Sequence, residues 1–312
     1  MNHAAASPFC SIRAATLGGE PLYGSAIRAD RCVFISWPRP WWDTKTLWSR
    51  HFPDTARELI MKIRKSTKTR FFLFDPATRD LAHDRSLSVI CMPCGAAHQV
   101  PLIDLTAALE AYETSCLCTT RQADEIIKSS VFVCTHSNRD QCCAKFGYGF
   151  AKQLRMITEA SGAEVRVFET SHLGGDRFAG TAIAFPSGTM HGWLRLGDAA
   201  SFAEALLTNR IHAKTYRGSI FLDRPAQVAE AFVRSELSPR FERTPIKSFH
   251  VEAPTDLEQR VSVEIAEREG ISVFVDLVLR QQSYQTYSDC ADLARGAAGE
   301  AKRWVVDRWS ER

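Results

Sequence analysis

The sequence lacks several features that would assign it to a class at once. No stretch approaches about 18 consecutive apolar residues, which excludes a transmembrane helix. Residues 1–18 hold one arginine and no apolar core, so we expect no secretory signal there and expect a cytoplasmic protein without a membrane partner. Lysine and arginine (39) nearly balance aspartate and glutamate (36), which argues against a dedicated nucleic-acid-binding protein.

The motifs of several common enzyme classes are absent too. There is no P-loop, no G-x-G-x-x-G, no G-x-S-x-G and no H-E-x-x-H, and no carboxylate pair stands out as a glycosidase acid and nucleophile. Glycine (17) and proline (13) are too few for a collagen-like chain, and 45% hydrophobic with 24% charged residues is typical of a globular protein. The 312 residues predict about two domains.

Short β-rich runs alternate with helical spacing, which predicts an α/β protein. In the N-terminal part the expected order is strand, helix, three strands and a helix, over 31–37, 55–63, 69–74, 87–91, 98–103 and 104–112. The middle part repeats this order, with a strand, a long helix, a strand and a hairpin over 131–133, 141–160, 165–168, 181–185 and 190–196. In the last third we expect helices over 226–237 and 290–309 and strands over 248–252, 260–265 and 271–279.

Ten cysteines are more than we expect of an ordinary cytosolic chain, where clustered thiols usually indicate metal or redox chemistry. Cys91 and Cys94 form a C-x-x-C pair, but no helix follows to stabilise a thiolate. With Cys116 and Cys118 they could bind zinc, although the second pair is C-x-C. We favour two thiols at the end of a hairpin.

The most informative segment joins a strand to a helix and carries thiols at both ends of the connecting loop. Cys134 ends the strand, and Cys142 and Cys143 follow at the helix start, which Asp140 is expected to cap. The loop after the next strand, residues 171–178, has a histidine, two glycines and an aspartate. Two soft sulfurs with an imidazole suit iron–sulfur or zinc chemistry.

These residues resemble a family. The pattern Cys-Thr-His-x-x-x-Asp-x-Cys-Cys-Ala followed by Ser-His-x-Gly-Gly-x-Arg-Phe-Ala is similar to that of the sucrase/ferredoxin-like proteins, a branch of the thioredoxin-like [2Fe-2S] ferredoxins. The resemblance is most specific over 131–196 and weaker at Cys10, at residues 19–22 and 37–41, and at residues 216–218. It implies two tandem thioredoxin-like layers with a C-terminal α/β extension, which we divide at 1–122, 123–225 and 226–312.

The resemblance also implies a ligand set for the cluster. Cys134 and Cys143 match the two cysteines, with Cys142 as the competitor for Cys143. His172 matches the first histidine, and Asp176 stands where the family commonly has the second. Three outcomes are open: Asp176 binds the cluster, another group such as His136 or Cys142 replaces it, or the cluster is absent.

From this resemblance we expect a [2Fe-2S] protein that transfers one electron between redox partner proteins, and we favour an electron carrier over a hydrolase or an oxidoreductase with its own substrate. The alternative is a cluster-free thioredoxin-like binding module or thiol redox protein acting through Cys134 and Cys142 or Cys143. A zinc-stabilised domain built on Cys91, Cys94, Cys116 and Cys118 is the third hypothesis.

Overall fold

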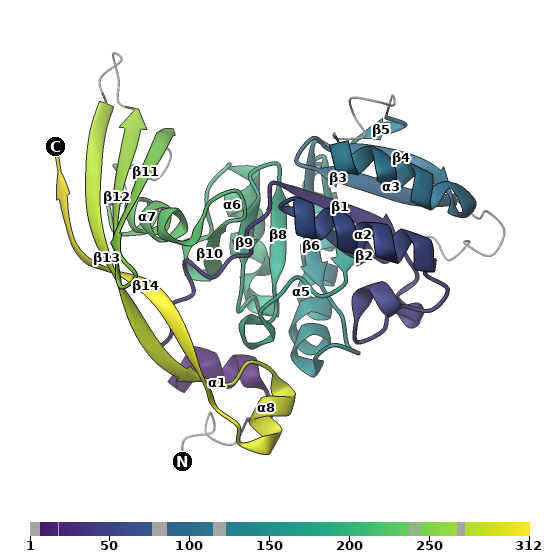
Figure 1. Cartoon of the computed structure of the whole chain (residues 1–312), viewed down its shortest axis with the longest axis horizontal. Coiled ribbons are helices and arrows are strands. Elements are labelled where there is room, and N and C mark those ends of the chain that lie inside the picture. The colour runs from purple at the N-terminus through teal and green to yellow at the C-terminus, as the bar shows by residue number, and fades with distance from the viewer. Residues whose placement is uncertain are drawn as a thin grey trace.

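The structure is a computed structural model that describes residues 7–17, 19–76, 86–114, 123–237, 240–241, 244–266 and 272–312. Figure 1 shows a central sheet flanked by helices, with a second, curved sheet to one side of it. The central sheet has the strand order β10-β9-β8-β6-β7-β2-β1-β3-β4-β5, and the second has the order β11-β12-β13-β14. The α/β prediction is therefore confirmed.

The N-terminal half of the central sheet follows the predicted order of elements. Its members are β1 (Arg31–Ser36), α2 (Asp54–Ser66), β2 (Thr69–Phe74), β3 (Ser86–Met92), β4 (Ala96–Pro101) and α3 (Leu105–Thr114). β2 is parallel to β1, whereas β3 is antiparallel to β1 and β4 to β3. The short β5 (Glu125–Ile126) pairs with β4 at the edge.

The second half repeats these directions. Its members are β6 (Ser129–Cys134), α5 (Gln141–Ala160), β7 (Val165–Thr170), β8 (Ala182–Phe185), β9 (Thr189–His191), α6 (Ala199–Leu207) and β10 (Tyr216–Ser219). β7 is parallel to β6, β8 is antiparallel to β6 and β9 to β8. The repetition agrees with two tandem layers, while the thioredoxin-like assignment and the boundaries at 122 and 225 stay predictions.

Both halves contribute to one shared aromatic core. Phe34 of β1 stacks on Phe132 of β6 with ring centroids 3.5 Å apart, and Phe132 stacks on Phe168 at 4.8 Å. The opposite faces of the strands have separate cores: Val33 and its neighbours lie under α2 and α3, and those around Val131 lie under α5 and α6. Since apolar side chains alternate between two buried faces, these strands have continuous apolar runs.

The C-terminal part differs from the prediction at its end. The predicted helix and three strands are present as α7 (Arg224–Ser235), β11 (Ile246–Thr255), β12 (Glu258–Ala266) and β13 (Ser272–Thr286), and α7 packs on the strands. The helix predicted over 290–309 is wrong, because α8 (Cys290–Arg295) ends at Gly296, which has a φ of 66°. The chain then forms β14 (Gly299–Glu311), which pairs with β13.

The long β13–β14 hairpin carries α8 toward α1 (Cys10–Leu17), and Figure 1 shows the two helices next to each other below the central sheet. In the part of the chain that the structure describes, no helix is long and apolar enough to cross a membrane.

Candidate metal centre

Two neighbouring parallel strands position the candidate ligands. β6 and β7 pair with Cys134 opposite Thr170, so the loops that follow both strands emerge at the same edge of the sheet. The first loop ends at Asp140, whose carboxylate accepts the backbone N–H of Cys142 at 2.7 Å and caps α5 as predicted. This cap places Cys142 and Cys143 in the first turn of α5.

The second loop turns back on itself through two glycines. Gly174 and Gly175 have φ values of 98° and 82°, a conformation that side chains disfavour, and a short 3-10 turn starts at Asp176. The buried Arg217 donates to the carbonyl of Gly174 at 3.0 Å and stabilises this turn. His172 and Asp176 therefore face the start of α5.

The four residues that the sequence predicts as ligands lie together, and we call them the His172 site: Cys134, Cys143, His172 and Asp176. The donor atoms of the two cysteines and the histidine lie within 4.8 Å of one another. Asp176 Oδ1 is 3.7 Å from Cys143 Sγ and 3.1 Å from His172 Nδ1. The carboxylate and both sulfurs are buried, whereas the His172 side chain is 21% exposed.

Buried charges shift the ionisation of this site. The Cys143 thiol, which donates to Cys134, and the nearby His172 hold the pKa of Cys134 well below its usual range, against the effect of burial. The pKa of Cys143 is raised because its thiol donates to the Cys134 thiolate and because it is buried. Burial alone would lower the pKa of His172, but the Cys134 thiolate and Asp176 raise it. Without a metal, the four groups thus favour one thiolate beside a protonated imidazole, and His172 releases this proton when it binds a metal.

Asp176 and its cationic neighbour modulate this pattern. Burial raises the pKa of Asp176, opposed by the charges of His172 and of Arg139, whose guanidinium lies 3.3 Å from Oδ2. The 3.1 Å approach of His172 Nδ1 to Oδ1 is not aligned as a hydrogen bond, so Nδ1 has no hydrogen-bond partner. Both the imidazole and the carboxylate are therefore available as ligands.

His136, an alternative ligand in the sequence analysis, has a local structural contact. Its Nδ1 accepts the backbone N–H of His172 at 3.2 Å, and its ring lies edge-on to Trp42. Its Nε2 is buried without a hydrogen-bond partner, and burial lowers its pKa. His136 thus helps to position the loop that carries His172.

Cys142 does not point toward the His172 site. Its sulfur lies 3.7 Å from Cys10 Sγ and 3.1 Å from Cys290 Sγ, in a second buried group that also includes Asp140. Adjacent helix residues point about 100° apart, so Cys142 and Cys143 face different neighbours. The sequence analysis assigned Cys290 no role and gave Cys10 only as part of the resemblance, although this helix geometry predicts separate environments for Cys142 and Cys143.

The C-x-x-C pair lies at the end of the β3–β4 hairpin, as favoured above. Cys91 is buried in β3, and Cys94 is exposed in the turn, with its sulfur 3.2 Å from the carbonyl of Cys91. Cys116 and Cys118 lie outside the described residues, so the four-cysteine zinc site stays a prediction.

A surface depression opens beside the His172 site. It has a volume of about 380 Å³ and includes His172, Arg139, Arg64, Arg70 and Lys45 in its lining. Every charged side chain in its lining is cationic. The exposed edge of His172 therefore faces a basic surface.

The family of the chain follows from comparison with known proteins. A family model described as sucrase/ferredoxin-like matches residues 22–218. The chain belongs to the sucrase/ferredoxin-like family. Both loops of the His172 site lie inside the matched range, whereas α1, α8 and the second sheet lie outside it.

A curated relative matches a shorter region. The altered inheritance of mitochondria protein 32 of Debaryomyces hansenii is 36% identical over 63 residues, which is 20% of this chain and 23% of that protein. The match spans about a quarter of the length of this relative. It therefore adds a local likeness to the family membership.

Proposed function

We propose that this sucrase/ferredoxin-like protein binds a [2Fe-2S] cluster at the His172 site and carries single electrons between redox partner proteins. The observation that supports this proposal is the convergence of Cys134, Cys143, His172 and Asp176, from two loops, at one buried place. When bound, such a cluster supplies a one-electron acceptor.

The donor set fits this group in number and chemistry. Thiolates are the usual ligands of iron–sulfur clusters, and imidazoles replace two of them in some [2Fe-2S] centres. Cys134 already favours the thiolate form that a metal requires. The unpartnered Nδ1 of His172 and the adjacent carboxylate of Asp176 complete four donors.

Asp176 should tune the potential downward. A carboxylate adds one negative charge that a neutral imidazole at the same place lacks, and histidine ligation is associated with higher potentials. Arg139 at 3.3 Å from Asp176 offsets part of this charge. We therefore propose a lower potential than that of a relative with a second histidine at this position.

The basic depression suggests the chemistry of the partner. His172 is the part of the site that reaches the surface, and the cationic side chains of Arg64, Arg70 and Arg139 line the same depression. Charge complementarity accelerates association between proteins. We propose that the redox partner docks here through an acidic surface.

The test is anaerobic purification with iron and acid-labile sulfide analysis, visible absorption, and EPR after dithionite. We expect about two iron and two sulfide per chain and a reduced-state EPR signal. Cys134→Ser and Cys143→Ser should lose the cluster, whereas Cys142→Ser and the buried control Cys32→Ser should keep it. Asp176→His should keep it and raise the midpoint potential.

Other results would overturn the proposal. Metal without acid-labile sulfide would indicate a mononuclear site, for which the 4.8 Å grouping of donors is also small enough. A colourless, iron-free protein after reconstitution would favour the second candidate, a thiol redox pair formed by the Cys134 thiolate and the Cys143 thiol. An unchanged spectrum and potential in Asp176→Ala would exclude Asp176 as a ligand.

A further inference from the structure

A second group of thiols lies outside the His172 site, and we call it the three-thiol cluster: Cys10, Cys142 and Cys290. The three sulfurs come from the first residue of α1, the first turn of α5 and the first residue of α8. Cys10 and Cys290 are separated by 280 positions in the chain, yet their sulfurs are 3.6 Å apart. All three residues are buried.

The spacing of the sulfurs fits a single tetrahedral ion. Two thiolates bound to one zinc at about 2.3 Å lie about 3.8 Å apart in tetrahedral geometry. The distances from Cys10 Sγ to Cys142 Sγ and Cys290 Sγ are 3.7 and 3.6 Å. The third distance, between Cys142 and Cys290, is 3.1 Å, so a small separation of these two would complete the triangle.

Asp140 supplies a fourth donor, a carboxylate oxygen, beside the three sulfurs. Its Oδ1 accepts the backbone N–H of Cys142 at 2.7 Å, and its Oδ2 accepts that of Cys290 at 2.8 Å. One carboxylate therefore fixes the backbone of two of the three cysteines. It is grouped with the three sulfurs within 4.8 Å, and each carboxylate oxygen retains a lone pair for a metal.

Thiol packing alone is a weak reason for this arrangement. A thiol is a poor hydrogen-bond donor and acceptor, so three S–H groups stabilise each other little. A disulfide between Cys142 and Cys290 would use two of the three sulfurs and would not account for the position of Cys10. The starts of α1 and α5 carry partial positive charge, which favours the thiolate forms that a soft divalent ion binds.

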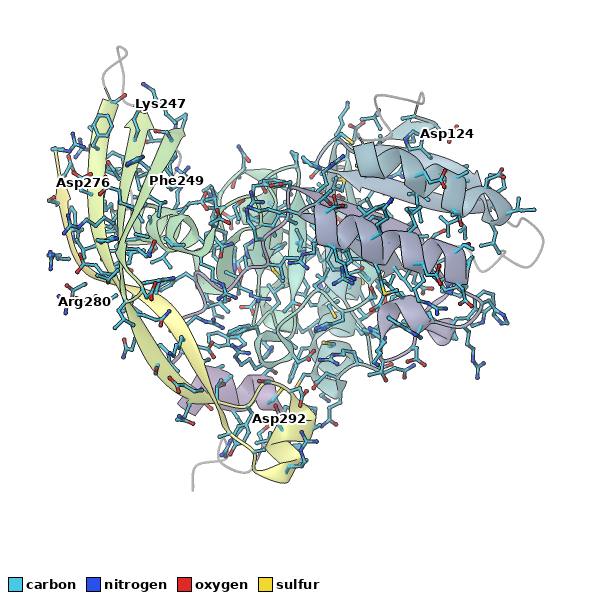
Figure 2. All side chains as sticks on the ribbon, in the orientation of Figure 1. Asp124, Lys247, Phe249, Asp276, Arg280 and Asp292 are labelled. Carbon is cyan, nitrogen blue, oxygen red and sulfur yellow. The ribbon has the colours of Figure 1, made fainter. Side chains whose placement is uncertain are left out.

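The location of the cluster indicates what an ion would do. α1 has 8 residues and α8 has 6, and helices of this length are not stable by themselves in water. In Figure 2 the label Asp292 marks α8, which connects β13 to β14 at the lower end of the curved sheet. An ion that joins three distant segments would close long loops and stabilise their docking.

We propose that Cys10, Cys142 and Cys290, with Asp140, bind one zinc ion that ties the N-terminal helix and the C-terminal hairpin to the start of α5. Thiolate ligands with one oxygen donor suit zinc in a closed, structural site. The site shares no ligand with the His172 site, although Cys142 and Cys143 are neighbours in the chain. Variants of Cys10 and Cys290 therefore test it without removing a ligand of the proposed cluster.

The test measures zinc and iron in the same anaerobic preparations. We expect about one zinc per chain in the wild type and at least a tenfold loss in Cys10→Ser and Cys290→Ser. These variants should keep iron and acid-labile sulfide. Conversely, Cys143→Ser should lose iron and keep zinc, and the buried control Cys32→Ser should keep both.

A measurement on the wild type covers the case in which these variants fail to fold. The protein is treated with a chelator and alkylated with iodoacetamide, with and without added zinc, and each cysteine is followed by mass spectrometry. Zinc should protect Cys10, Cys142 and Cys290, while the exposed Cys94 reacts in both samples. Cobalt added to chelator-treated Cys143→Ser should give the intense absorption of a tetrahedral thiolate site.

Three results would overturn the proposal. The first is a wild type that holds no zinc and gains no protection from added zinc. The second is zinc that disappears with Cys143 and remains in Cys290→Ser. The third is a disulfide between Cys142 and Cys290 in anaerobically purified protein. In each case iron and sulfide bound at the His172 site would leave the proposed function standing.

Discussion

Gly147→Ala tests whether close packing of α5 on the end of β6 positions the His172 site. A Cβ at Gly147 would lie 1.9 Å from the backbone oxygen of Cys134, a distance that real contacts do not show. The obstacle is backbone, so β6 and α5 must separate by more than an ångström. Cys134 and Cys143, which lie on the two elements, would move apart with them.

The expected magnitude follows from two opposing effects. Alanine is favoured over glycine inside a helix by about 1 kcal/mol, while forcing extra volume into a packed interior costs about 1–3 kcal/mol. Because the contact is with backbone, we expect the upper end of the cost and a net loss of about 2 kcal/mol in the free energy of unfolding. Iron bound at the His172 site should fall in parallel.

Gly149 provides the matched control on the same helix. A Cβ there would meet only a side-chain atom of Leu196 at 3.9 Å, an ordinary contact. Gly149→Ala should therefore stabilise the protein by up to about 1 kcal/mol. Urea unfolding and iron analysis of both variants form the assay. If Gly147→Ala is as stable as Gly149→Ala and keeps its iron, the proposed role of this close contact is wrong.

Three further predictions concern single residues. Burial lowers the pKa of His191 to about 3 from 6.5, so the free energy of unfolding should fall by about 1.4 kcal/mol per pH unit as pH decreases between these values. The assay is the midpoint of urea unfolding measured at decreasing pH. The slope should be flatter in His191→Gln and unchanged in His250→Gln, an exposed control. The Cys91 thiol lowers the pKa of Cys94 to about 6. The rate at which iodoacetamide labels Cys94 should therefore reach half of its maximum near pH 6. A midpoint near the ordinary pKa of a thiol would contradict this. Arg217→Lys should lower the free energy of unfolding by about 2 kcal/mol and reduce bound iron, because lysine cannot reproduce the guanidinium contacts with Ser25 and with the carbonyl of Gly174 in the loop that carries His172. Equal stability would refute that role.

Much of the fold is predictable from local sequence. The apolar runs over 69–74 and 131–133 become buried strands, and the Asp140 cap starts α5 where predicted. These features depend on residues close together in the chain, and local propensity and capping act over that range. The end of the chain shows the limit. The segment after Gly296 becomes β14 because β13 offers it a pairing edge, and only tertiary contact supplies that edge.

The same distinction applies to the His172 site and the three-thiol cluster. The sequence indicated the residues of the His172 site through their resemblance to the family, and the parallel pairing of β6 with β7 brings the loops that carry them to one edge of the sheet. The sequence determined neither the partners of Cys142 nor the meeting of Cys10 with Cys290. Those depend on where the C-terminal hairpin and the N-terminal helix dock, and segments 280 positions apart carry no local signal of their contact. Helix geometry separates the two adjacent cysteines, and tertiary packing alone decided that the thiols facing Cys142 are those of Cys10 and Cys290.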